Sequence, residues 1–328
     1  MRRLVTIVAV VLTPLLLGAG WSGEPLRPML RQPARIEARR VVLHPGEPRR
    51  RQAGALTFLG GVALSSPDRA FGGFSALNVR GERFTLVADG GGVVRFSMGR
   101  DWKVRDPVFQ DLPGGPWTGW TRRERDAEAL AVDPKTGRAW VAFEAFHQIW
   151  RFSPGLTRAE RGVAPAAMAR WRVNGGAESF TRLADGRFVA ISESPPRGRT
   201  GAREGLVWAG DPTERPRPAF RFGYLPSRGH DPVDMAELPD GRLLVLERGF
   251  DLPFRWSNRV MLVERGALRP GATVRGRLLA TLAAPLIHDN FEGIDASRER
   301  RATILWLVSD DNRLPVQRTL LLKFRMDG

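Results

Sequence analysis

The sequence predicts an all-β, single-domain protein with the fold of a six-bladed antiparallel β-propeller. Three observations support this fold: a strand–turn–strand pattern recurs along the chain, turn residues separate the apolar runs, and helical periodicity is almost absent after the first 20 residues. The repeats follow one another at roughly 50 to 60 residues, which is the length of a four-stranded propeller blade. The 36 glycines and 25 prolines are dispersed, as expected for many short strands joined by turns.

The N-terminus predicts export from the cell. Residues 1–23 read MRRLVTIVAVVLTPLLLGAGWSG, with two arginines, an apolar run from Leu4 to Leu17 and small residues up to Gly20. This order is typical of a secretory signal, and we expect cleavage after Gly20. An uncleaved N-terminal anchor is the alternative, although Pro14 interrupts the run and the run is short for a membrane span. A periplasmic or secreted protein without a transmembrane span in the mature chain is therefore expected.

Composition narrows the function classes further. The chain has no cysteine, which excludes disulfides, thiolate metal sites and cysteine nucleophiles. Its 51 basic and 35 acidic residues give a formal charge of +16. The arginines are scattered, which favours a solvated surface over a nucleic-acid-binding face. We expect a monomer that binds a small anionic or ester substrate and no nucleic acid.

Five repeats are evident after the N-terminal segment. They cover residues 73–98, 126–154, 176–194 with 205–210, 232–250 with 258–266, and 290–312 with 318–326. Tight turns are predicted at Arg80-Gly81-Glu82, Asp133–Gly137, Asp185-Gly186 and Asp240-Gly241. Strand-like residues 35–43 and 55–65 suggest a sixth blade and a strand that closes the ring. The predicted organisation is a signal at 1–20, an N-terminal segment with a ring-closing strand at 21–54, and the propeller domain at 55–326.

Acidic residues recur at matched positions of the repeats. In an antiparallel hairpin, the start of the first strand and the end of the second lie at the same edge. The matched pairs are Glu128 with Glu144, Glu178 with Glu193, Asp234 with Glu247, and Glu292 with Asp310, while Ser75 faces Asp89 in the first repeat. The first strand of a blade usually lines the central channel. The pattern therefore predicts a ring of carboxylates at one mouth of the channel.

A ring of carboxylates suits a divalent cation and acid–base chemistry. Carboxylate and amide oxygens are hard ligands, so we predict that Glu292, Asp310 and Asn312 bind Ca²⁺ or another divalent cation. Glu128, Glu178 and Glu292 are the predicted catalytic residues, and no organic cofactor is expected. The predicted binding residues are Asp89, Glu144, Glu193, Asp234, Glu247, Arg248 and His288. Each acid taken alone could instead cap a turn or pair with an arginine, as Glu247 with Arg248; recurrence in every blade favours a functional role.

A family resemblance is carried by GGFSAL (72–77), FTLVADGG (84–91), DAEALAVD (126–133), DMAELPDGRLLVLERGF (234–250) and, above all, DNFEGIDASR with LWLVSDDNRLPVQRTLLLKF (289–324). These motifs resemble those of the bacterial phytase-like family labelled "esterase-like activity of phytase". The resemblance covers roughly residues 55–326. It implies an exported propeller and a hydrolase of esters or phosphate esters. A non-catalytic periplasmic binding or scaffold propeller is an alternative, so whether the chain is an enzyme is left open. A lactonase-like propeller is a further alternative.

Overall fold

The chain folds almost entirely into β-strands. A computed structural model describes residues 25–253 and 255–327, so the predicted secretory signal at residues 1–20 lies outside the described residues. The only helices within them are the short 3-10 helices η1 (Arg123–Arg125), η2 (Pro154–Leu156) and η3 (Ala166–Met168). The predicted all-β class is confirmed. No helix in the described part of the chain is long and apolar enough to cross a membrane.

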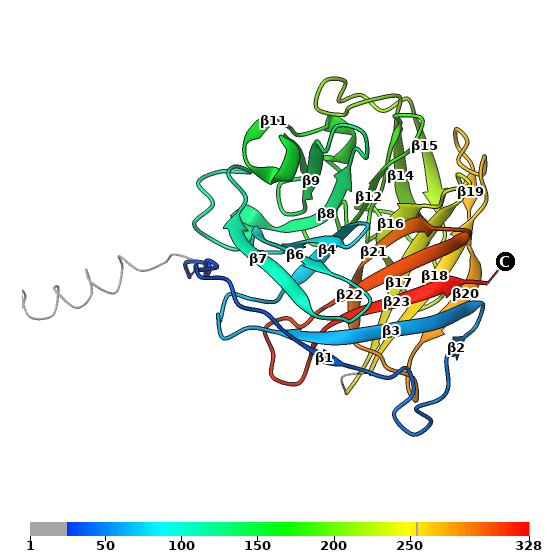
Figure 1. Ribbon diagram of the computed structural model, residues 1–328. Coiled ribbons are helices and arrows are strands. Elements are labelled where there is room, and N and C mark those ends of the chain that lie inside the picture. The colour runs from blue at the N-terminus through cyan, green and yellow to red at the C-terminus, as the bar shows by residue number, and fades with distance from the viewer. Residues whose placement is uncertain (1–24, 254, 328) are drawn as a thin grey trace, which may run out of the picture.

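The strands form five sheets that stand around a central axis as the blades of a propeller (Figure 1). Blade 1 contains β4 (Phe74–Arg80), β5 (Arg83–Ala88), β6 (Gly92–Met98) and β7 (Val104–Asp111). Blade 2 contains β8 (Ala127–Val132), β9 (Ala139–Phe143), β10 (Gln148–Phe152) and β11 (Ala159–Val163). Blade 3 contains β12 (Ser179–Arg182), β13 (Phe188–Ile191), β14 (Arg203–Trp208), β15 (Phe220–Tyr224) and β19 (Thr273–Val274). Only β19 pairs in parallel among these described strands.

The last two blades complete the ring. Blade 4 contains β16 (Asp231–Glu237), β17 (Leu243–Asp251), β18 (Arg255–Val263) and β20 (Arg277–Leu282). Blade 5 contains β21 (Asn290–Glu299), β22 (Ala302–Asp310), β23 (Thr319–Met326), β3 (Leu56–Ser65), β1 (Glu37–Arg40) and β2 (Gln52–Ala53). Strands from both ends of the chain therefore share one sheet.

The prediction of six blades was wrong, because the N-terminal strands do not form a blade of their own. The fifth repeat supplies only three strands, β21 to β23, and β3 adds the fourth. Eight residues of β23 pair with β3, from Thr319 opposite Leu64 to Met326 opposite Leu56. This pairing joins the two ends of the chain and covers the edge that β23 would otherwise expose.

The inner strands β4, β8, β12, β16 and β21 line a central channel. Each lies beside the next, and β21 contacts both β16 and β4, so the ring is closed. A cavity of about 280 Å³ lies between them, lined by residues of all five strands, which include Leu77, Leu130, Thr181, Met235 and Ile294. Aromatic side chains pack between blades. The Trp140 ring of blade 2, for example, lies 4.8 Å from the Phe188 ring of blade 3.

The predicted turns between the first and second strands of the blades lie at one end of the ring. Gly81 lies between β4 and β5 with φ +60°, and Gly241 lies between β16 and β17 with φ +84°. Glycine adopts this left-handed backbone without the steric cost of a side chain. The start of each inner strand and the end of each second strand therefore lie at the opposite end of the ring, where the acidic residues were expected.

Candidate functional site

An irregularity of the inner strands places one side chain per blade at the channel mouth. In four blades the ladder between the first and second strands skips one residue near this end. The skipped residues are Ser75, Glu128, Val233 and Glu292. In blade 3, Glu178 directly precedes β12. A bulge of this kind redirects the side chain of the extra residue, so the channel mouth receives three glutamates, one serine and one valine.

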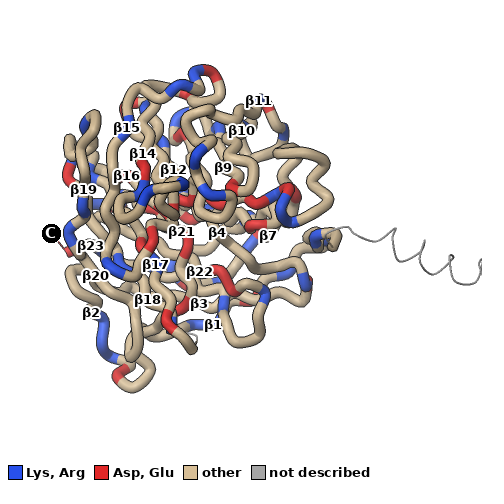
Figure 2. Tube along the Cα trace, turned by 180° about the vertical axis from the view of Figure 1, so that it is seen from behind, with Lys and Arg blue, Asp and Glu red and all other residues tan. Residues whose placement is uncertain are grey.

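The second strands supply another residue each at the same mouth. Asp89 and Glu144 directly follow the last paired residues of β5 and β9, and Glu193 lies two positions beyond the last paired residue of β13. Arg248 and Asp310 are themselves paired, in β17 and β22. Four blades therefore present an acid at this position, whereas blade 4 presents Arg248. We call the acids Asp89, Asp126, Glu128, Glu144, Glu178, Glu193, Glu292 and Asp310, together with Arg248, the acidic rim. Figure 2 shows acidic segments gathering near the centre of the ring, close to β4, β12 and β21.

The structure does not bring Asp234 and Glu247 together with the other rim acids, because the register of β16 differs by one residue from the expected register. The skipped residue of β16 is Val233, so Asp234 lies one step along the strand. Its carboxylate accepts hydrogen bonds from the backbone N–H groups of Met235 and Ile294, each at 2.7 Å. Glu247 instead accepts from the Tyr224 hydroxyl at 2.6 Å. A shift of one residue turns a strand side chain to the opposite face, which removes both acids from the rim.

Two groups of rim carboxylates lie close enough to share a cation. Asp126, Glu128 and Glu144 form one group, in which one oxygen of each lies within 4.8 Å of the others. Glu144, Glu178 and Glu193 form the second by the same measure, so Glu144 belongs to both. Among the described residues, no arginine or lysine forms an ion pair with Asp126, Glu128, Glu144 or Glu178. The rim of blades 2 and 3 is therefore largely uncompensated acid.

Crowding and burial raise the pKa values of these acids. Burial, together with the neighbouring Asp126 and Glu193, raises the pKa of Glu144 to about 7, although the N–H of Gly176 opposes the shift. Burial and Asp89 raise the pKa of Asp126 to about 6. For Glu128 and Glu178, burial and then the adjacent carboxylates hold the pKa well above the ordinary value. Part of the rim is thus protonated near neutral pH.

Arginines neutralise the other side of the rim. Arg248 donates to Glu193 Oε1 at 2.9 Å and forms an ion pair with Glu292. Arg122 forms an ion pair with Asp89, and Arg313 donates to the same carboxylate at 3.2 Å. The other arginine-paired acids, Asp89 and Glu292, lie on blades 1 and 5. In the carboxylate-rich half on blades 2 and 3, Glu193 is the one acid of the two groups that pairs with an arginine among the described residues.

The residues predicted as metal ligands have other partners. Glu292 also accepts from the Asn290 amide at 2.8 Å. Asp310 accepts from the backbone N–H of Asn312 at 2.6 Å, and the Asn312 amide donates to Gln317 at 3.3 Å. Neither group of closely spaced carboxylates includes Glu292 or Asp310. The oxygen ligands best placed for a cation are those of blades 2 and 3.

His288 lies on the loop before β21, and its ring nitrogen Nδ1 shares a hydrogen bond of 2.8 Å with the Leu286 carbonyl oxygen. Sequence reasoning missed Asp126, Asn290, Arg122 and Arg313. A signal for the first two was present, because Asp126-Ala127-Glu128 and Asn290-Phe291-Glu292 place a polar residue two positions before the skipped glutamate. Nothing in the local sequence marked Arg122 and Arg313, which reach Asp89 from distant loops.

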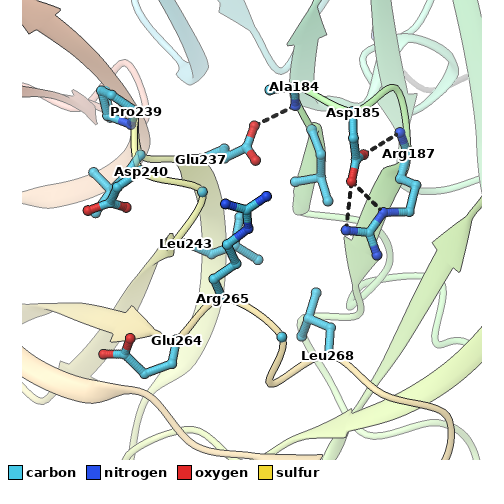
Figure 3. A pocket seen from close by; sticks show the side chains of 15 residues that line it. Ala184, Asp185, Arg187, Glu237, Pro239, Asp240, Leu243, Glu264, Arg265 and Leu268 are labelled. Atoms are coloured by element: carbon cyan, nitrogen blue, oxygen red, sulfur yellow. Dashed lines mark hydrogen bonds and ion pairs between the residues drawn. The ribbon is translucent and has the colours of Figure 1, made fainter.

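A further pocket lies at the opposite end of the ring from the acidic rim. It has a volume of about 450 Å³ and lies between the β12–β13 and β16–β17 turns (Figure 3). Its charged residues are of both signs: Asp185 pairs with Arg187 at 2.8 Å, and Glu237 accepts from the Ala184 N–H at 2.5 Å. No rim carboxylate lines this pocket, so the functional candidates stay at the acidic mouth.

Similar solved structures were found at low sequence identity. The glutaminyl cyclase of Myxococcus xanthus is 11% identical, covers 92% of this chain and 98% of its own, and has a TM-score of 0.47. The Cps50 (Swd1) β-propeller domain of Myceliophteria thermophila is 10% identical, covers 82% of this chain and 99% of its own, and has a TM-score of 0.39. Hydrazine synthase of Kuenenia stuttgartiensis is 14% identical with a TM-score of 0.36, and the match spans 74% of this chain and 58% of that one. These likenesses carry no argument about function.

Family membership rests on the sequence itself. No curated protein matches the chain significantly. Residues 69–313 match the phytase-like family described as "Esterase-like activity of phytase". The match spans blades 1 to 4 and the strands β21 and β22 of blade 5. It therefore includes the rim residues Asp89, Glu128, Glu292 and Asp310. The chain therefore belongs to the phytase-like family of propellers.

Proposed function

We propose that this protein is an exported, metal-assisted hydrolase of esters or phosphate esters that works at the acidic rim. The observation that supports the proposal is the carboxylate-rich half of the rim, where two groups of three acids share Glu144. Of the five acids in these groups, four form no ion pair with a described arginine; the fifth, Glu193, pairs with Arg248. The donor set consists of carboxylate oxygens, which are the ligands preferred by calcium and magnesium. The residues present therefore fit a divalent cation.

The rim residues divide naturally between holding a cation, moving a proton and binding an anion. Asp126, Glu128 and Glu144 would hold the cation, which when bound supplies polarisation of a phosphoryl or carbonyl oxygen. Burial and the neighbouring Glu193 raise the pKa of Glu178 well above its ordinary value, so its carboxyl suits proton donation to a leaving group. Arg248 on the facing blade presents a guanidinium to an anionic substrate group.

A non-catalytic binding propeller is the second candidate. The pairing of Asp89 with two arginines and of Glu193 and Glu292 with Arg248 favours it. Such pairs are already satisfied within the protein and leave fewer free groups for chemistry. This candidate predicts ligand binding at the mouth without turnover.

Turnover with matched variants separates the two candidates. The hydrolase proposal predicts that the purified protein cleaves p-nitrophenyl acetate or p-nitrophenyl phosphate in calcium and loses this activity in a chelator. Glu128→Gln and Glu178→Gln should each lower kcat by about 100-fold or more. Glu264→Gln, at an exposed site lining the opposite pocket, should behave as wild type. No turnover of either substrate class, or equal rates in all variants, contradicts the proposal.

Export belongs to the same proposal. We infer a periplasmic or secreted monomer that has lost residues 1–20, from the charged, apolar and small-residue order of the N-terminus. N-terminal sequencing of the protein recovered from the periplasm should begin after Gly20. A chain that retains Met1 contradicts this inference.

A further inference from the structure

Large exposed apolar side chains gather on the loops around the acidic rim. They are Leu26, Met29, Trp117, Trp120, Leu252, Leu314 and Val316. Trp117 is 73% exposed and Leu252 is 81% exposed. Water-exposed side chains of this size in several loops at one end of a molecule mark an interaction surface. We call the segments 25–31, 113–122, 251–253 and 311–318 the mouth loops.

Each mouth loop is tied to a rim group. The loop with Trp117 and Trp120 leads into Arg122 and Asp126, the β17–β18 hairpin follows Arg248, and the loop with Leu314 and Val316 follows Asp310. In Figure 1 the β17–β18 hairpin and the β22–β23 loop project toward the same, lower side of the ring. These loops therefore lie at the mouth end of their blades, beside the rim groups.

The N-terminal segment is fastened to this face by buried contacts. Leu26 forms a β-bridge with Thr121, and the Arg27 N–H donates to the Trp120 carbonyl at 2.9 Å. The buried Arg27 guanidinium also donates to Asp111 Oδ1 at 2.6 Å and to the Gly90 carbonyl at 2.7 Å. Leu26 and Trp120 are thus held side by side with their side chains in solvent.

The exposed charges of the mouth loops and their borders are mainly positive. The exposed cations are Arg31, Arg122, Arg123, Arg255 and Arg318, and Asp251 is the exposed acid on these described segments. The rim acids lie deeper, where three of them are paired with arginines. An incoming surface therefore meets apolar tips and arginines first, on a chain of formal charge +16.

We propose that the mouth loops form a docking face for an anionic lipid bilayer. Tryptophans at the rim of a binding face, aliphatic loop tips and flanking arginines are the combination that enters the headgroup region of such a membrane. The tips come from separate loops with polar residues between them. A fluid lipid surface accommodates such separated tips more readily than a rigid protein partner does. The acidic rim would then face the lipid headgroups. The inference does not depend on the hydrolase proposal, because binding is measured without turnover.

Vesicle sedimentation tests the docking face. The purified full chain should partition onto vesicles that contain phosphatidylglycerol, and less onto pure phosphatidylcholine or at high salt. The triple variant Trp117→Ser, Leu252→Ser, Val316→Ser should bind the anionic vesicles at least about tenfold more weakly. The matched control Leu59→Ser, Val108→Ser, Leu278→Ser removes exposed apolar side chains from β3, β7 and β20 and should bind as wild type. Equal losses in both variants overturn the proposal.

Tryptophan fluorescence tests whether the mouth loops themselves contact the membrane, because the apolar run of residues 4–17 could also bind vesicles. Brominated lipid should quench the tryptophan emission of wild type more strongly than that of Trp117→Phe, Trp120→Phe, because only groups within the bilayer surface meet the bromine atoms. Equal quenching of the two proteins overturns the proposal even if both bind vesicles. Absence of vesicle binding, as expected for a protein partner, overturns it as well.

Discussion

Arg248 is the residue that offsets the negative charge of two acids in the acidic rim. It occupies the position at which the other four blades present an acid, and it contacts Glu193 and Glu292 from two neighbouring blades. Its pKa is raised, because the attraction of Glu292, Glu178 and Glu193 outweighs burial, which acts in the opposite direction. A buried guanidinium between two carboxylates is stable only as long as all three groups remain together.

Replacing Arg248 with methionine is predicted to destabilise the protein most at high pH. The loss leaves Glu292 buried without its cation, at a cost of about 3 kcal/mol at pH 8. Burial already raises the pKa of Glu292 and Arg248 lowers it, so the variant's carboxyl takes up a proton as the pH falls and the deficit shrinks by pH 5. Urea unfolding at both pH values measures this. Arg242→Met, which breaks an exposed pair with Asp240, should cost less than about 0.5 kcal/mol. Equal deficits for Arg248→Met at pH 5 and 8 contradict the prediction.

The sequence located most of the rim because hairpin geometry needs only strand order and turn positions. Glu128, Glu144, Glu178 and Glu193 lie together as that geometry requires. Asp234 and Glu247 could not be placed correctly, because nothing in the local pattern reveals that β16 skips Val233 and not its neighbour. The division of the rim by arginines also escaped prediction. It depends on side chains such as Arg313 that approach from loops remote in sequence.

Between elements, buried aspartates join the inner strands in series. Asp234 on β16 accepts from the Ile294 N–H of β21 at 2.7 Å. Asp295 on β21 accepts from the Val79 N–H of β4 at 2.6 Å and from the Asn78 amide at 3.2 Å. At these two junctions of the channel wall, a buried carboxylate therefore bridges one inner strand to the next.

Asp295 predicts a specific pH dependence of stability. Burial raises its pKa to about 6, so the folded state binds a proton that the unfolded state has released. The stabilisation is complete below about pH 4 and is lost as the pH rises through 6. In Asp295→Asn, the decline in free energy of unfolding between pH 5 and 7 should be smaller than in wild type. Asp240→Asn, in an exposed turn where Arg242 lowers the carboxyl pKa, should leave that decline unchanged. The same decline in Asp295→Asn and wild type contradicts the prediction.

At the scale of the whole molecule, the fold is a ring of five blades closed by strands from both ends of the chain. The sequence predicted the class and the repeats, since each repeat carries its own turns and apolar runs. Six blades were predicted because the N-terminal strands have the sequence pattern of an independent blade. The pairing of β3 with β23 in the structure shows that these strands complete the fifth blade. Pairing between segments that are distant in sequence cannot be predicted from local sequence patterns.

Closure by β3 predicts that one buried charge there weakens the whole ring. Val62 is fully buried opposite Leu321, so Val62→Asp should cost about 4 kcal/mol or more. Calorimetry should show one transition at a lower temperature, because every blade depends on its neighbours. Leu59→Asp, at a 38% exposed position of the same strand, should shift the transition little. A separate early transition with the main one unmoved would mean that the ring does not depend on this closure.

Calcium binding measured by isothermal calorimetry at pH 8 tests whether the rim of blades 2 and 3 is a cation site. Glu144 belongs to both groups of carboxylates, so Glu144→Gln should abolish the binding heat seen with wild type. Its backbone partners Gly175 and Gly176 can still donate to the amide oxygen, which keeps the fold intact. Glu264→Gln should bind calcium as wild type does. Binding that survives in Glu144→Gln, or no binding by wild type to calcium or magnesium, would contradict a cation site at this rim.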